Sequence, residues 1–215
     1  MKPAPFRYMR PSRVSEMLEL LREHGAEGKI LAGGQSLVPA MNFRLARPAA
    51  LLDINDLAEL DFLRLDGGGL SIGALARHAA FHRPRGDLPL ARLLSEIVRH
   101  VAHYPIRQRG TFCGSLAHAD PASEWCLVAA TLDATIFVTG PRGARTIAAG
   151  AFFRGTFRTD LAADELITEV RLPLHDQGWR GGFQEFARRA GDFALAMALA
   201  ALRLEGGRIV AARLG

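Results

Sequence analysis

Two glycine-bearing turns constrain the fold of this chain more than any other feature of its sequence. The first, Ala32 to Leu37, joins a short apolar run to a segment that can begin a helix. The second, within the stretch Arg107 to Glu124, again sets glycine beside threonine and serine. Because glycine adopts backbone angles that other residues avoid, both segments favour sharp connections between elements. The chain is therefore expected to contain α/β units.

Both turns have the chemistry of an anion site. Without a Cβ, glycine lets consecutive main-chain N–H groups converge on an anion, and a following helix adds partial positive charge. The residues of this kind are Gly33, Gly34, Gln35 and Ser36 in the first turn and Thr111, Gly114 and Ser115 in the second. Two such turns could hold one diphosphate from two sides. Alternatively, each glycine serves only the geometry of its turn.

The familiar nucleotide-binding fingerprints are absent from the sequence. The stretch GGGLSIG, residues 67–73, lacks the G-x-G-x-x-G spacing of a Rossmann fold. Gly28 and Lys29 are followed by Ile30, where a P-loop requires serine or threonine. Neither nucleotide-binding class is predicted.

Residues 1–56 predict a small α/β unit. Apolar residues between 14 and 21 recur at helical spacing, and Gly25 offers a stop. Strands are expected at 29–32 and 50–54, with a short helix between them.

The rest of the chain predicts a larger unit, residues 57–176, and a third segment, residues 177–215. The elements expected in the larger unit are two strands joined by the Asp66 to Gly69 turn, a helix from Leu88 to Ala102 that Pro105 ends, and strands at 134–140 and 164–173. The third segment predicts a strand, an Ala/Leu-rich strand or helix, and a hairpin at Gly206 and Gly207.

Composition excludes several classes of protein. No run of about eighteen apolar residues exists, and the N-terminus lacks an apolar signal core, so no membrane span is predicted and the cytoplasm is the expected location. The formal charge of +5 could suggest nucleic acid. However, Lys2 and Lys29 are the only lysines and the arginines are scattered, so no nucleic-acid partner is expected.

No metal or catalytic site is predicted. Cys113 and Cys126 cannot supply the four ligands of an iron–sulfur cluster, so we expect free thiols. His118 is expected to fix its loop by hydrogen bonding rather than to act as an acid or base. Four further histidines resemble metal spacings only loosely and predict packing or surface roles: His78, His82, His100 and His103.

Longer motifs carry a family resemblance. AGGQSLVPAMNFRLARP, residues 32–48, and RGTFCGSLAHADPASE, residues 109–124, resemble the two flavin-binding signatures of the FAD-binding medium subunits of molybdenum hydroxylases. This group contains aerobic carbon monoxide dehydrogenase and xanthine dehydrogenase. The resemblance continues through DELITEVRLP and FQEFARRAGDFALA. It implies an α+β fold of the vanillyl-alcohol-oxidase type, with FAD between two subdomains and then the start of a C-terminal α+β domain.

The resemblance also implies site residues. The first turn, Ala32, Gly33, Gly34, Gln35, Ser36 and Leu37, would wrap the FAD diphosphate, and Thr111, Gly114 and Ser115 would complete the cradle. Glu124 falls at the ribose or adenine end, and Val101, Leu166 and Ile167 fall where apolar side chains line the cofactor. Arg189 would face the flavin ring, where a basic residue stabilises the reduced anion. Alternatively, Arg188 and Arg189 form a solvated turn.

The sequence departs from the family pattern in two places. Cys113 stands where many members have a second glycine, and a cysteine side chain there can point into the core. Residues 177–215 are expected to be a truncated C-terminal flavoprotein domain, because members usually continue beyond the last hairpin. The first turn offers Gln35 and Ser36, which do not form covalent flavin links, so non-covalent FAD is expected.

The resemblance implies an oxidoreductase subunit in a hetero-oligomer. Substrate would be oxidised at a molybdenum cofactor on a large subunit, and electrons would pass through two [2Fe–2S] clusters of a small subunit. FAD on this chain would deliver them to an external acceptor. The alternative is an FAD- or nucleotide-binding module without turnover, acting as a sensor or assembly partner.

Overall fold

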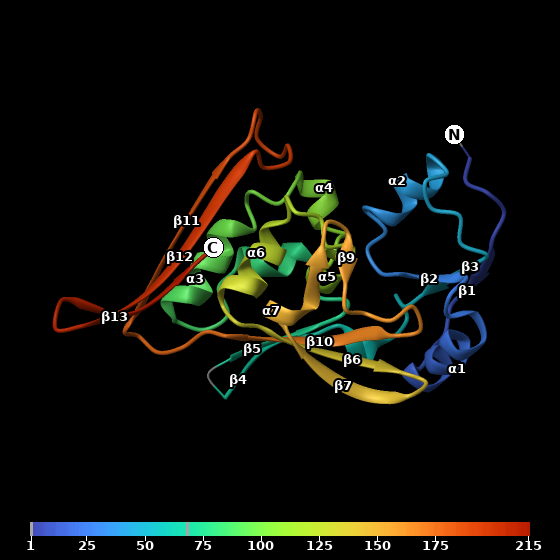
Figure 1. Cartoon of the computed structure of the whole chain (residues 1–215), viewed down its shortest axis with the longest axis horizontal. Helices are drawn as coiled ribbons and strands as arrows, with labels where there is room; N and C mark the ends of the chain where they lie inside the picture. Colours follow the sequence, from blue (N-terminus) through green and yellow to red (C-terminus); the bar gives the residue numbers. More distant parts are fainter. Residues whose placement is uncertain (1, 68) are drawn as a thin grey trace.

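Three main sheets follow one another along the chain in the computed structural model, which describes residues 2–67 and 69–215. The first sheet is parallel, with strand order β1-β3-β2. Its part of the chain contains β1 (Arg7–Met9), α1 (Val14–His24), β2 (Gly28–Leu31), α2 (Leu37–Asn42) and β3 (Ala50–Asp53). These elements form the blue part of the ribbon (Figure 1).

The central strand of this sheet, β3, is buried along its whole length. All four residues of β3 are buried, as expected for a strand covered on both faces. Met17 and Leu21 of α1 are fully buried in the same core as Leu52. The predicted helix and both predicted strands are confirmed to within about three residues at each end.

The second sheet has five antiparallel strands in the order β4-β5-β10-β6-β7. The strands are β4 (Leu63–Asp66), β5 (Gly69–Gly73), β6 (Thr135–Gly140), β7 (Gly143–Ala148) and β10 (Leu166–Pro173). Its helices are α3 (Pro89–Ile97), α4 (Tyr104–Arg107), α5 (Phe112–His118), α6 (Glu124–Thr131) and α7 (Ala149–Phe152). Two 3-10 helices, Ala58–Leu60 and His78–His82, and a small hairpin, β8 (Phe153–Gly155) with β9 (Arg158–Thr159), complete this part.

The five-stranded sheet separates two hydrophobic cores. Leu166 belongs to the core of the first sheet, whereas its neighbour Ile167 belongs to the larger core under α3, α5 and α6. Consecutive residues of a strand point to opposite faces, so β10 contributes to both cores.

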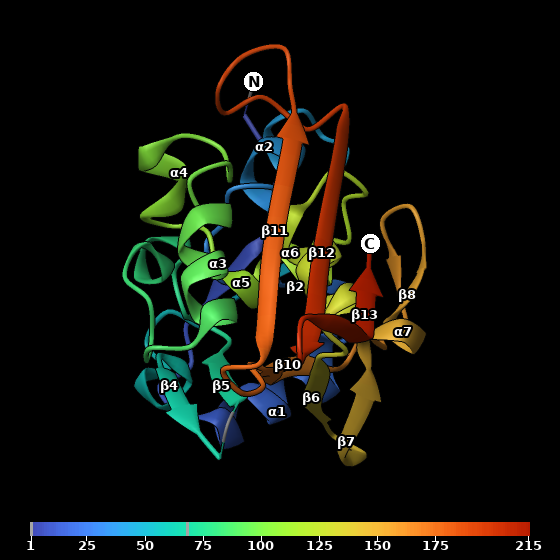
Figure 2. The ribbon, with the colours of Figure 1, turned by 90° about the vertical axis from the view of Figure 1, so that its left-hand side faces the viewer.

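The third sheet is an antiparallel meander of β11 (Trp179–Phe186), β12 (Ala196–Glu205) and β13 (Arg208–Leu214). One face packs on α3 and α6, and Figure 2 shows its strands crossing in front of these helices. Leu199 and Ala201 of β12 are buried in the larger core, while Ala196 and Ala198 are exposed. The Ala/Leu-rich segment is therefore a strand, and the predicted hairpin at Gly206 and Gly207 is confirmed.

The structure corrects one predicted helix. α3 ends at Ile97, not at Ala102, and Pro105 does not end it but lies in the first turn of α4. Ala102 has a φ of 45°, which breaks the helical path between α3 and α4. Proline fits a first turn because its missing N–H is not needed there.

The hairpin predicted at Asp66 to Gly69 lies mostly within the described residues. β4 and β5 confirm the predicted hairpin at Asp66 to Gly69, but Gly68 lies outside the described residues. Among the described residues, no helix has the length and apolar character needed to cross a membrane.

Candidate functional site

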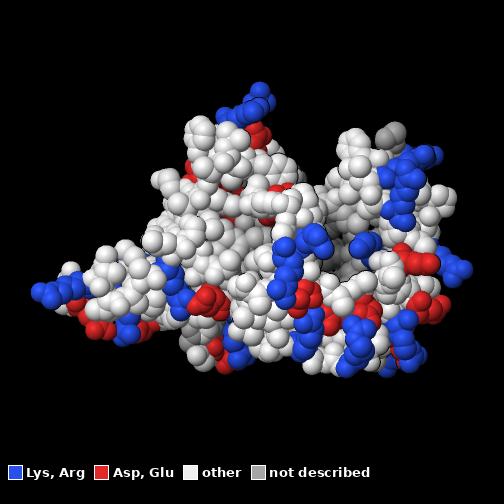
Figure 3. Space-filling view, viewed as in Figure 1, with Lys and Arg blue, Asp and Glu red and all other residues white. Residues whose placement is uncertain are grey.

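The two glycine turns meet in three dimensions. Gly33 packs directly on the main chain of the second turn, where a Cβ atom on Gly33 would lie 2.6 Å from Gly110 Cα. In the same direction it would fall on the carbonyl oxygen of Arg109. The surface dips between the lobe that carries α2 and the rest of the molecule (Figure 3). Glycine at position 33 is therefore required by the packing of one turn on the other.

The first turn presents a row of free main-chain donors. Gly34 has a φ of 71°, in the left-handed region, and the Gln35 side-chain amide donates to the Gly33 carbonyl at 3.0 Å. None of the N–H groups from Gly33 to Leu37 has an acceptor within the described parts of the chain. Consecutive free N–H groups at the start of a helix form an anion-binding nest. These residues fit a diphosphate.

The second turn is the capped start of a helix. Thr111 is the N-cap of α5, and its Oγ1 accepts a hydrogen bond from the Gly114 N–H at 3.0 Å. Ser115 N–H donates to the Thr111 carbonyl at 3.1 Å. Gly114 and Ser115 thus lie inside α5, with their N–H groups already paired. A Cβ on Gly114 would lie 2.7 Å from Thr111 Oγ1, so glycine keeps the cap intact.

Cys113 turns its side chain away from this surface. Its thiol is buried, with Sγ 3.5 Å from the Gly73 carbonyl oxygen. Burial raises the pKa of the Cys113 thiol. The expectation that this side chain enters the core is confirmed.

A polar network that the sequence reasoning missed joins the two turns. Asn55 Nδ2 donates to the Ala32 carbonyl at 2.9 Å, and Arg77 donates to Asn55 Oδ1 at 2.5 Å. Arg77 Nη1 also donates to the Arg109 carbonyl at 2.7 Å. The missed signal was the motif LDIN at the carboxyl end of β3, because ligands of α/β sheets bind near such ends.

The network begins at Asp53. Its Oδ2 accepts from the Tyr8 hydroxyl at 2.5 Å, and its Oδ1 accepts from the Asn55 main-chain N–H at 2.9 Å. Burial opposes ionisation of Asp53, but the hydrogen bonds from Tyr8 and Asn55 outweigh it and hold the pKa of the carboxyl below its usual value. Asp53 therefore anchors Asn55 as an ionised acceptor.

The other candidate residues lie in several places. Glu124, the first residue of α6, is buried, and this burial together with nearby Glu185 and Asp120 raises its pKa to about 7. Val101 follows α3 and is 6% exposed. Leu166 and Ile167 are buried on opposite faces of β10.

Arg189 lies in the exposed loop between β11 and β12. In this loop Gly191 has a φ of 84° and packs so closely on the His103 ring that a Cβ would collide with it. The loop therefore rests on the connection between α3 and α4, and it extends beyond the sheet at the top of Figure 2.

The histidines do not form a metal site. His78 is buried, and its Nδ1 accepts from the Trp125 indole N–H at 3.0 Å. Burial, with Arg107 and Arg77 nearby, lowers the pKa of His78 to about 4. The His118 ring packs against Phe157. Across residues 2–67 and 69–215, no group of three potential metal ligands occurs.

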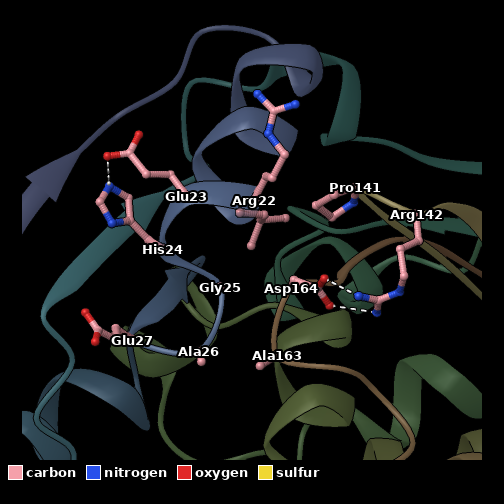
Figure 4. A pocket seen from close by; sticks show the side chains of 11 residues that line it. Arg22, Glu23, His24, Gly25, Ala26, Glu27, Pro141, Arg142, Ala163 and Asp164 are labelled. Atoms are coloured by element: carbon pink, nitrogen blue, oxygen red, sulfur yellow. Dashed lines mark hydrogen bonds and ion pairs between the residues drawn. The ribbon is translucent and has the colours of Figure 1, made fainter.

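A cavity of about 600 Å³ lies away from the turns. It opens beside Gly25 to Glu27, at the amino end of β2, whereas the first turn follows the carboxyl end of that strand. In its wall Arg142 forms a bidentate ion pair with Asp164 (Figure 4). None of the candidate residues lines it.

The structure combines a parallel sheet, a nest of free N–H groups among the described residues and a capped helix of a second sheet, features typical of flavoproteins that bind a diphosphate. Residues 4–175 match the family model described as the FAD binding domain in molybdopterin dehydrogenase. This chain belongs to that family, as the resemblance implied. It is the FAD-binding subunit of a molybdenum-containing hydroxylase or dehydrogenase, and thus part of an oxidoreductase complex.

Individual relatives agree with this assignment. The chain is 41% identical to the caffeine dehydrogenase subunit beta of Pseudomonas sp. (strain CBB1), with 100% of this chain and 73% of that protein covered. It is 40% identical to the nicotine 6-hydroxylase medium subunit of Paenarthrobacter nicotinovorans, over 97% of this chain and 73% of that protein. The solved carbon monoxide dehydrogenase of Hydrogenophaga pseudoflava has 35% identity and a TM-score of 0.94, covering 100% of this chain and 75% of that one.

Proposed function

We propose that this chain holds FAD non-covalently across the junction of residues 1–56 and 57–176, and that residues 177–215 form a third unit. The observation that carries the proposal is the row of five N–H groups from Gly33 to Leu37 that have no acceptor among residues 2–67 and 69–215, beside the second turn. The diphosphate would be held mainly by these donors. Thr111, Gly114 and Ser115 would contribute by shaping α5 against the first turn.

The proposal gives the other candidate residues supporting roles. Glu124 would meet the ribose or adenine end, and Arg189 would approach the flavin ring from its exposed loop. Val101, Leu166 and Ile167 would support the cofactor from the hydrophobic cores in which they are buried. When bound, FAD supplies redox chemistry in one- and two-electron steps.

The proposal places the electron source on other chains. Cys113 is buried and Cys126 is partly buried, and burial raises the pKa of both thiols, so they are poorly suited to ligate a cluster. Electrons would therefore come from the [2Fe–2S] clusters of a small subunit, which receives them from a large molybdenum subunit, and would leave to an external acceptor. Reduced thiols also suit the cytoplasm, where we propose the complex works.

Stepwise reconstitution tests this proposal. Titrating the 215-residue chain with FAD should quench flavin fluorescence to a saturating one-to-one stoichiometry. Adding the reduced iron–sulfur and molybdenum subunits should then bleach the bound flavin. Saturable binding without bleaching would show that the chain binds FAD but does not pass electrons. The absence of saturable binding would refute the proposal.

A further inference from the structure

The structure assigns Asn55 and Arg77 as positioning residues that set the separation of the two glycine turns and thereby the affinity for FAD. We call this pair the Asn55–Arg77 bridge. The inference rests on the proposed function, because FAD is the ligand whose diphosphate the turns would hold. Neither residue belongs to the glycine-bearing turns themselves.

The bridge joins the first subdomain to the second through side chains alone. Asn55 holds the first turn, because its Nδ2 donates to the carbonyl of Ala32, the residue before Gly33. Arg77 holds the second turn, because its Nη1 donates to the carbonyl of Arg109. The bond from Arg77 Nη2 to Asn55 Oδ1, at 2.5 Å, closes the link.

Main-chain bonds fix Arg77 relative to the second turn. His78 N–H donates to the Gly110 carbonyl at 2.9 Å, and Phe112 N–H donates to the Ala76 carbonyl at 3.1 Å. These bonds form a β-bridge between Arg77 and Thr111. Arg77 therefore moves with the start of α5, while Asn55 moves with β3.

The chemistry of Arg77 suits a bridge better than an ion pair. Its guanidinium is partly buried, and both acceptors that it contacts are neutral oxygens. Burial lowers its pKa from the ordinary value, so the position costs free energy that no directly paired carboxylate repays. A planar fork with several donors can reach two acceptors at fixed angles, which a lysine ammonium cannot do.

The test compares four variants of the full 215-residue chain: R77Q, R77K, N55A and the double variant N55A/R77Q. Flavin fluorescence gives the Kd for FAD, and thermal unfolding of the FAD-free chain gives stability. Amide exchange of His78 and Phe112 reports on the junction without any cofactor. R142Q is the matched control, because it removes an arginine from an exposed ion pair beside the distant cavity.

We expect R77Q and R77K to weaken FAD binding alike, by roughly ten- to a hundredfold, the effect of losing a hydrogen bond to a charged group. The double variant should lose little more than either single variant, because both changes break one link. Exchange at His78 and Phe112 should rise in R77Q. R142Q should match the wild type in all three measurements.

Four results would overturn the inference. A wild-type Kd in R77Q would show that the bridge does not affect FAD binding. A wild-type Kd in R77K would show that Arg77 contributes only its positive charge near the diphosphate. Fully additive losses in the double variant would separate Asn55 from Arg77. If the wild-type chain takes up no FAD, the proposed function fails, and unchanged amide exchange in R77Q would then overturn the bridge separately.

Discussion

Gly33 and Arg109, 76 positions apart by their numbers, are in contact through main-chain atoms, and a Cβ on Gly33 would occupy the space of the Arg109 carbonyl. The contact places the first turn of the parallel sheet against the entrance to α5. It also changes what a substitution at Gly33 reports. A larger side chain there would push the two turns apart before it could reach an anion.

The glycines of the first turn should therefore fail in two different ways. G33V should lose FAD and also lower the stability of the FAD-free chain, since the clash is with main chain. G34A should keep most of the stability, with a cost of about 1–2 kcal/mol for a non-glycine residue in the left-handed region, yet should bind FAD more weakly. Thermal unfolding and FAD titration separate the two effects.

The control for these variants is G150A. Gly150 lies in α7, and a Cβ there would meet no other part of the chain within 4 Å, so alanine should not lower stability and should leave FAD binding unchanged. Equal behaviour of G33V and G150A would show that the turns are not in contact.

The cap of α5 should be measurable through T111V. This change removes the oxygen that accepts the Gly114 N–H and should cost about 1 kcal/mol of stability, as for other N-caps. T111S keeps the hydroxyl and should behave like the wild type. Urea unfolding at constant pH gives both values, and equal stabilities for the two variants would contradict the cap.

Glu124 should make the FAD-free chain more stable in mild acid. Its pKa is raised from 4.5 to about 7 in the folded state, so the folded chain binds more protons than the unfolded chain between these values. The contribution of Glu124 to stability therefore falls as pH rises from about 4.5 to about 7, and stays low above that range.

E124Q should remove this dependence. The glutamine variant should be more stable than the wild type at pH 8, by on the order of 2 kcal/mol, and close to it at pH 4.5. Urea unfolding at both pH values measures the difference. A constant difference between the two chains across this range would show that Glu124 titrates normally.

Both cysteine thiols should be unreactive in the folded chain. Burial raises the pKa of Cys126 to about 12, and Cys113 is also buried and shifted upward. Because the thiolate is the reactive form, a thiol-specific reagent should modify neither residue at pH 8 until denaturant is added. Rapid modification of either thiol in the native chain would show that this thiol lies on the surface.

FAD should leave the chain on acid precipitation. Non-covalent binding predicts a colourless pellet and a yellow supernatant, measured by flavin absorbance in each fraction. The holoprotein denatured in urea and passed through a desalting column should likewise lose its flavin. A yellow pellet would refute non-covalent binding.

The sequence by itself determined the elements whose signals are local. Helical spacing in α1, the alternation of β6 and the glycines of the last hairpin depend on neighbouring residues, so these elements were predictable. The two flavin signatures likewise identified the family, because the turns need particular small residues at particular spacings. The end of α3 was less predictable, since Ala102 at positive φ carries no local signal.

Only the tertiary structure decided how the two signatures meet. Residues Asn55 and Arg77 have ordinary neighbours in sequence, and their bond forms because β3 ends beside the segment that leads to α5. The same holds for the role of Gly33, which serves the contact of the first turn with Arg109 and Gly110. The physical reason is that these contacts join segments distant in the chain, so they exist only after the two subdomains have packed together.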